Sequence, residues 1–138
     1  MQFVLLIYQG TTPTPKSEEW KAFSDEEKKT IYAEYEALNK MPGVMPGLPL
    51  GLPQDATTVR VQNGKTLTTK GPFVDVRGAV GGYFVLEAEN VDAAIKVAAR
   101  VPAARLGGAI EIRPAEKYWW CLADVGSCSD TNSGIVTR

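Results

Sequence analysis

The 138-residue sequence contains no histidine. This absence excludes Ser-His-Asp and Cys-His catalytic groups, together with the iron and zinc sites that depend on histidine ligands. Only two cysteines are present, Cys121 and Cys128, and both lie near the C-terminus. They are too few and too local for a disulfide framework, so we expect two free thiols. We also expect no metal site and no cofactor, and any proton transfer must use a carboxylate, lysine, tyrosine or water.

An excess of one charge and a long apolar run are absent too. The chain has 15 basic and 16 acidic residues, so it lacks the clustered basic charge of a nucleic-acid-binding protein. No apolar run approaches the roughly 18 to 20 residues that a membrane helix needs. The start, residues 1–8, lacks the basic segment and cleavage site of a signal peptide. We therefore expect a soluble, cytoplasmic protein that binds neither nucleic acid nor membranes.

What remains is the composition of an ordinary globular domain, with 44% hydrophobic and 22% charged residues. The length suits one domain, which we place at residues 1–114. Residues 115–138 are predicted to be a C-terminal extension. Its aromatic part, 118–122, would dock on the domain or on a partner subunit, because exposed tryptophans form a sticky patch. Its polar, turn-rich end is expected to be flexible.

Helix and strand signals follow one another along residues 1–114. Continuous apolar runs predict strands covered on both faces at 3–8 and 83–86. Between residue 8 and the first helix we expect only a polar loop, 9–20. Ser24 and Glu27 have the spacing of a capping box and predict the start of that helix, which ends before Pro42. Its apolar stripe consists of Ile31, Tyr35 and Leu38.

The middle and second half of the domain predict a hairpin, a second helix and a last strand. Asn63-Gly64 joins alternating strands at 57–61 and 65–69. A helix is predicted after Asn90, with an apolar stripe of Val91, Ala94, Ile95, Ala98 and Val101. The segment 42–53 has seven glycines or prolines among its 12 residues. We interpret it as an ordered loop packed on the domain, with a pocket wall or lid as the alternative.

The resulting order is β-α-β-β-β-α-β with a last strand at 109–113, which is an α+β, ferredoxin-like frame with an inserted hairpin. Two helices can cover only one face of its sheet, yet two of the strands are apolar on both faces. The second face is therefore expected to meet the same face of another copy in a homodimer. The alternative is that residues 42–53 and the C-terminal extension cover it within one chain.

Residues 68–114, TTKGPFVDVRGAVGGYFVLEAENVDAAIKVAARVPAARLGGAIEIRP, resemble the second half of a YCII-related, or DGPF-domain, protein. VLLIY at 4–8 and ATTVRVQNGKTL at 56–67 agree with the first half of that family. The resemblance implies a dimeric α+β barrel but supplies no reaction, because a fold does not carry a function. Where the family has Asp-Gly-Pro-Phe, this chain begins with Lys70, so an Asp/His mechanism cannot be transferred.

Candidate site residues surround the Gly-Pro-Phe loop. The resemblance matches Asp75 to an acidic family position and Arg77 to a position that commonly holds lysine. In the catalytic interpretation, Asp75 takes or orients a proton, while Arg77 and Lys70 hold negative charge. These residues would lie at the mouth of a ligand-binding cleft, and Phe73 would line that cleft. In the structural interpretation, Asp75 pairs with one of the two basic residues and only stabilises the loop.

Two tyrosines, Tyr8 and Tyr83, complete the predicted ligand-binding set, with core packing as their alternative role. The paired glycines at 81–82 precede a strand rather than a helix, so a bulge or close packing is favoured over phosphate binding.

Two functions are compatible with these residues. One is a cofactor-independent isomerase or lyase-type enzyme acting on a small organic molecule, which the basic residues allow to be anionic. The alternative is a non-catalytic ligand-binding or regulatory module. A third interpretation makes the protein chiefly an assembly unit, with the tryptophan-rich extension as an arm.

Overall fold

Four antiparallel strands form the main sheet of the computed structural model, which describes residues 1–75 and 78–115. They are β1 (Gln2–Tyr8), β2 (Val44–Pro46), β5 (Val80–Glu87) and β6 (Ala109–Pro114), in the order β2-β5-β1-β6. This order is that of a ferredoxin-like α+β fold, and the predicted fold class is confirmed. The expectations for Arg77, for both cysteines and for the tryptophan-rich extension lie outside the described residues.

Alternation along the central strands separates the two faces of this sheet. In β1, Phe3 is 1% exposed and Leu5 is 0% exposed, while Val4 between them faces the other way. Leu5 pairs with Phe84 of β5 and with Ile112 of β6, so the three side chains lie on one face. This face, together with the helices, encloses the hydrophobic core.

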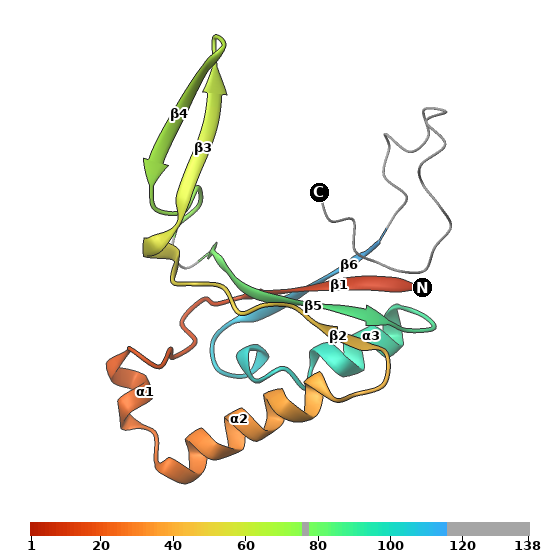
Figure 1. Ribbon diagram of the computed structural model, residues 1–138. Coiled ribbons are helices and arrows are strands. Elements are labelled where there is room, and N and C mark those ends of the chain that lie inside the picture. The colour runs from red at the N-terminus through yellow and green to blue at the C-terminus, as the bar shows by residue number, and fades with distance from the viewer. Residues whose placement is uncertain (76–77, 116–138) are drawn as a thin grey trace.

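Two helices, α2 (Asp25–Asn39) and α3 (Val91–Ala98), cover that face (Figure 1). The predicted capping box at the start of α2 is present, because Ser24 accepts a hydrogen bond from the Glu27 amide and donates its own amide to the Glu27 carboxylate. The Asn90 side chain caps α3 by accepting a hydrogen bond from the Ala93 amide. Ile31 and Leu38 are buried as predicted.

The predicted apolar stripe of α3 is only partly correct. Ala94, Ala98 and Val101 are buried, but Val91 and Ile95 are 49% and 50% exposed. Val97 instead packs against the core. The helix α3 meets the sheet through Ala94 and Ala98, which are four residues apart and lie on one face. Val91 and Ile95 lie on the neighbouring face, which turns toward solvent.

Two segments expected to be loops contain regular structure. A short helix, α1 (Glu18–Ala22), occupies part of the expected loop 9–20, and its N-cap Ser17 accepts a hydrogen bond from the Trp20 amide. The other is β2, the fourth strand of the main sheet, which lies in the segment 42–53 that was expected to be a loop. Gly43, at φ 84°, turns the chain so that Val44 pairs with Leu86 of β5. Pro46 is tolerated because β2 is an edge strand.

The predicted hairpin is confirmed and forms a separate two-stranded sheet of β3 (Thr57–Gln62) and β4 (Lys65–Lys70). Asn63 and Gly64 have φ angles of 50° and 74°, as a two-residue hairpin turn requires. A short 3-10 helix, Pro53–Asp55, precedes the hairpin. Figure 1 shows the hairpin rising on the side of the main sheet that faces away from α2 and α3.

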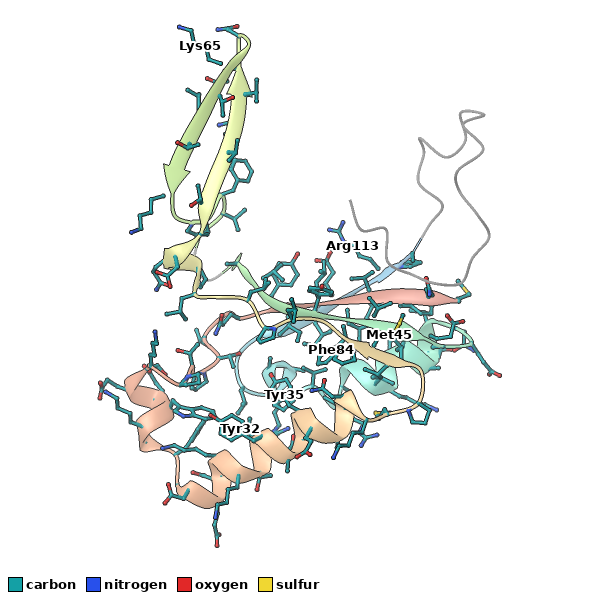
Figure 2. The ribbon with its side chains drawn as sticks, in the orientation of Figure 1. Tyr32, Tyr35, Met45, Lys65, Phe84 and Arg113 are labelled. Atoms are coloured by element: carbon teal, nitrogen blue, oxygen red, sulfur yellow. The ribbon has the colours of Figure 1, made fainter. Side chains whose placement is uncertain are left out.

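The second face of the main sheet carries apolar side chains as well. The register places Val4 beside Val85 and Leu6 beside Tyr83, with Met45 next in line on β2. Phe84 and Arg113 lie on opposite sides of the sheet in Figure 2. Within residues 1–75 and 78–115 no helix covers this second face, so its expected cover by another copy remains a prediction.

Candidate functional site

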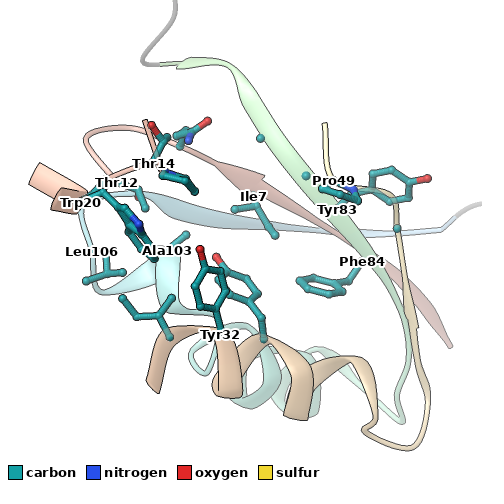
Figure 3. Close-up of a pocket in the computed structure, with 18 of the residues that line it drawn as sticks. Ile7, Thr12, Thr14, Trp20, Tyr32, Pro49, Tyr83, Phe84, Ala103 and Leu106 are labelled. Carbon is teal, nitrogen blue, oxygen red and sulfur yellow. The ribbon is translucent and has the colours of Figure 1, made fainter. Parts of the chain in front are cut away.

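A cavity of about 380 Å³ lies between α2 and the helix-covered face of the sheet (Figure 3). Trp20 and Tyr32 stand at one end of it, and Tyr83 stands with Pro49 at the other. Its five aromatic lining residues are Trp20, Tyr32, Tyr35, Tyr83 and Phe84. The polar residues among the rest of its lining are Gln9, Thr12, Thr14 and Asn39.

Two glycines of β5 create the space on the sheet side. Ile7 pairs with Gly82 and Tyr8 pairs with Val80, so Gly81 is the extra residue of a β-bulge. A Cβ atom added at Gly82 would meet only the Ile7 Cδ1 atom, at 3.8 Å. The volume that a larger side chain would occupy at this position therefore belongs to the cavity. The structure thus supports the bulge interpretation of the paired glycines.

An aromatic cluster forms the wall next to α1. Trp20 is 8% exposed, and its ring stands edge-on to that of Tyr32 with centroids 5.6 Å apart. The ring of Phe23 also stands edge-on to that of Trp20, with centroids 5.7 Å apart. Edge-to-face pairs of this kind fix the ring orientation in addition to burying area. The short helix α1 therefore places one large side chain, that of Trp20, in the cavity wall.

Tyr35 supplies a neutral hydroxyl to the same cavity. Burial raises the pKa of this hydroxyl, and the backbone of Ala103 and the charge of Arg105 oppose that rise only in part. The Arg105 guanidinium binds the Glu34 carboxylate with two hydrogen bonds, of 2.5 and 2.8 Å. This pair ties α2 to the residue that follows the 3-10 helix Pro102–Ala104. Ala103 of that helix and Leu106 after it line the cavity.

No lysine, arginine, aspartate or glutamate lies among the described residues that line this cavity. Thr12 has a buried hydroxyl without a hydrogen-bond partner in the described part of the chain. The lining thus combines aromatic surface with hydroxyl and amide groups. Such a lining suits a neutral, flat molecule, because an unpaired charge would lose its hydration without gaining a partner.

Of the residues predicted from the sequence, Tyr83 lines this cavity at its edge beside Pro49, although its register beside Leu6 puts it on the sheet face opposite the helices. Tyr8 lies on the sheet face opposite the helices, and Lys70 ends β4 and is exposed. Phe73 is 73% exposed and stacks under Arg60, whose Cζ atom lies 5.7 Å from the ring centroid. Asp75 is exposed as well.

Phe73 lines a second, more open cavity of about 520 Å³ at the base of the hairpin, together with Val74, Asp55 and Leu52. Of the predicted set, Tyr83 thus lines the first cavity and Phe73 the second, whereas Tyr8, Lys70 and Asp75 line neither. Among the described residues, Lys70 and Asp75 form no ion pair with each other. The pairing of Asp75 with Arg77 cannot be followed, because Arg77 is outside those residues.

Trp20, Tyr32 and Tyr35 are site residues that the sequence interpretation did not select. Tyr35 was recognised only as part of the apolar stripe of α2. The available signal was the phenolic hydroxyl within that stripe, since a tyrosine facing a core requires a partner for its oxygen. Trp20 lay in an expected polar loop, and no local pattern indicated that it would turn inward.

A family model for the YCII-related domain matches residues 1–117. The chain belongs to the YCII-related family. A search of curated proteins gives no match. Among solved structures, this YCII-related chain is similar to 5-chloro-2-hydroxyhydroquinone dehydrochlorinase (TftG) from Burkholderia phenoliruptrix AC1100 in complex with 2,5-dihydroxybenzoquinone. The two share 17% sequence identity over 86% of this chain and 96% of that one, with a TM-score of 0.41. This similarity is too low to transfer residues or chemistry.

Two further properties concern the described part of this YCII-related protein. None of its helices is both long enough and apolar enough to cross a membrane. The same residues bring together no group of three acidic, cysteine or histidine side chains that could hold a metal ion.

Proposed function

We propose that the protein is a homodimer whose subunits each bind a small, neutral, aromatic molecule in the cavity between α2 and the sheet. The observation that supports this function best is the cavity lining, which among residues 1–75 and 78–115 has five aromatic side chains and no charged one. Its volume of about 380 Å³ falls in the range of small-molecule sites and exceeds what a single benzene ring fills. The tyrosine and threonine hydroxyls would orient the polar groups of the ligand.

The dimer is supported by the second face of the sheet. Val4, Leu6 and Val85 would be hidden from water if two such faces packed together, as sheets commonly do at a separation of about 10 Å. In this arrangement the cavity of each subunit stays between α2 and its own sheet, and Tyr83, at the cavity edge, belongs both to the lining and to the second face.

The ligand class can be tested with two matched probes, 2-naphthol and 2-naphthoate, which share a ring system and differ in charge. Titration of labelled protein, followed by amide NMR signals, should show 2-naphthol shifting the signals of Gly47 and Gly82, both of which line the cavity. 2-Naphthoate should bind at least roughly tenfold more weakly, a difference of about 1.4 kcal/mol. Equal binding of the two probes would contradict the neutral class.

The position of the site can be tested with Gly82→Val. Its side chain enters the open volume next to Ile7, so 2-naphthol binding should be lost while the unfolding transition stays cooperative. The matched control is Gly51→Val, because an added Cβ there meets nothing within 4 Å and Gly51 lines only the second cavity. Unchanged binding by the Gly82 variant, or equal loss in both, would place the ligand elsewhere.

Proton transfer by Asp75 is a second candidate function, and it would be centred on the second cavity. Phe73 and Val74 line that cavity and precede Asp75 directly in the chain. In this alternative, Arg77 and Lys70 stabilise developing negative charge. Asp75→Asn should then abolish turnover of a substrate without changing the fold, and retained turnover would remove Asp75 from the mechanism.

A further inference from the structure

The β3–β4 hairpin stands apart from the rest of the molecule. Every residue from 57 to 70 is exposed, apart from Thr58, which is half-buried. The hairpin is fixed at its base, where the Gly71 amide donates to the Ala56 carbonyl at 2.7 Å and the Thr58 hydroxyl donates to the Gly71 carbonyl at 2.7 Å. The base is thus held in place while the two strands extend into solvent (Figure 1).

One face of this hairpin is β-branched. Val59 pairs with Thr68 and Val61 with Thr66, so these four side chains share a face. The two valines are 59% and 67% exposed. An isolated two-stranded hairpin is marginally stable in water, and an exposed strand edge invites pairing with other chains. A hairpin of this length and exposure therefore indicates a binding partner.

Charge favours a second copy of this chain as that partner. The hairpin contains three basic residues, Arg60, Lys65 and Lys70, and no acidic one. The rest of the chain contains all 16 acidic residues but only 12 of the 15 basic residues. The hairpin is therefore positive and the remainder of the chain is net negative, so charge attracts the hairpin to the body of another copy. Lys70 shares the face with Val59 and Val61, whereas Arg60 and Lys65 lie on the opposite face, so charge does not by itself select the docking face.

The reach of the hairpin agrees with this assignment. Six residues per strand span about 20 Å, whereas two face-to-face sheets lie about 10 Å apart. The hairpin rises on the open side of its own sheet, which is the side on which a second copy would pack (Figure 1). It therefore extends past the space between the sheets and runs beside the partner, and two-fold symmetry makes the contact reciprocal.

We propose that residues 57–70 form an intersubunit arm, whose face with Val59 and Val61 packs against the body of a second copy. This inference rests on the face-to-face dimer proposed above. It assigns the hairpin a role in assembly that the ligand cavity does not require.

Photo-crosslinking in the full-length chain tests the arm directly. A benzoylphenylalanine at position 61 places the reactive group on the docking face, and the same residue at position 60 places it on the opposite face. Native mass spectrometry first reports whether each variant is a dimer. Irradiation should then produce covalent dimers from position 61, at several times the yield from position 60, with the crosslinked peptide outside 57–70.

The outcomes separate the arm from the dimer. A native dimer without crosslinks from position 61, or with equal yields from both positions, overturns the arm and leaves the face-to-face dimer standing. A monomer at micromolar concentration overturns both.

A pair of acidic substitutions gives an independent measurement. Val61→Asp puts a carboxylate into the docking face, whereas Gln62→Asp puts the same group one residue further along, on the opposite face. Analytical ultracentrifugation should show the dimer dissociation constant rising at least about tenfold for Val61→Asp and less than about threefold for Gln62→Asp. Equal constants for the two variants would contradict docking through the valine face.

Discussion

The main sheet and the β3–β4 hairpin are built from similar β-branched and apolar residues, yet they end in opposite environments. Leu5 of the main sheet is 0% exposed, whereas Val61 of the hairpin is 67% exposed. The sheet is held by side chains from helices and strands far apart in the sequence, and the hairpin by a two-residue turn and its own ladder. Regular backbone structure therefore follows from local signals in both regions, but burial comes only where another layer is available.

The largest expected difference between the two regions is in stability. Leu5→Ala removes a fully buried side chain and should lower the free energy of unfolding by about 2 to 5 kcal/mol. Gln62→Ala, on the exposed hairpin, should change it by less than about 0.5 kcal/mol. Urea unfolding at one protein concentration measures both. Similar losses from the two substitutions would show that the hairpin belongs to the same packed unit as the sheet.

A second pair of substitutions locates the point at which the packed body ends. A Cβ added at Gly47 would meet the Tyr83 carbonyl oxygen at 2.6 Å and its ring at 2.7 Å. Gly47→Ala should therefore cost about 1 to 3 kcal/mol, because either β5 or the cavity wall must shift. Gly51→Ala meets no neighbour and should be neutral or stabilising by up to about 1 kcal/mol. Thermal unfolding compares the two variants. Equal melting temperatures would show that residue 47, like residue 51, lies outside the tightly packed body.

The sequence could predict the elements that local signals specify, and it could not predict those that depend on contacts distant in the chain. The capping box at Ser24, the Asn63-Gly64 turn and the cap at Asn90 are local signals, and each produced the expected element. Strand β2 was missed because it depends on pairing with β5 and on packing of Val44 against the core, both distant in sequence, while its glycines and prolines are those of a loop. The ferredoxin-like order was nevertheless predictable, since the longer strands and both main helices have strong periodicity.

The candidate site was less predictable than the fold. A resemblance based on the Gly-Pro-Phe loop led to Phe73 and Asp75, which the structure places away from the larger aromatic cluster. The lining of the cavity to which that cluster belongs joins Trp20, Tyr35 and Tyr83 from three separate elements. No spacing within one segment records such a meeting, because it depends on how helix and sheet layers pack together.

A capping substitution tests how far local signals matter inside the packed body. Ser24→Ala removes the hydroxyl that accepts from the Glu27 amide and should cost about 1 kcal/mol. Thr30→Ala is the control, since it removes an exposed hydroxyl from the middle of the same helix. It should be neutral or slightly stabilising, because alanine has the higher helix propensity. If urea unfolding gave equal losses for both, packing rather than capping would determine where α2 begins.

The smallest expected effect is the pH dependence that the buried hydroxyl of Tyr35 adds to the free energy of unfolding. Burial raises the pKa of the Tyr35 hydroxyl above its ordinary 10.0, so the unfolded chain loses this proton at a lower pH than the folded chain does. Below pH 10 the contribution of Tyr35 to stability is fully present, and it is lost as pH rises through the folded pKa. Tyr35→Phe removes the titrating group.

The free energy of unfolding of the unmodified protein should therefore decrease more steeply above pH 10 than that of Tyr35→Phe. Urea unfolding at several pH values between neutrality and strong alkali measures the two slopes. A constant difference between the proteins would reflect only the lost hydroxyl contact with the backbone of Ala103. Parallel curves would thus contradict burial of the Tyr35 hydroxyl, and with it the neutral character assigned to the cavity wall on α2.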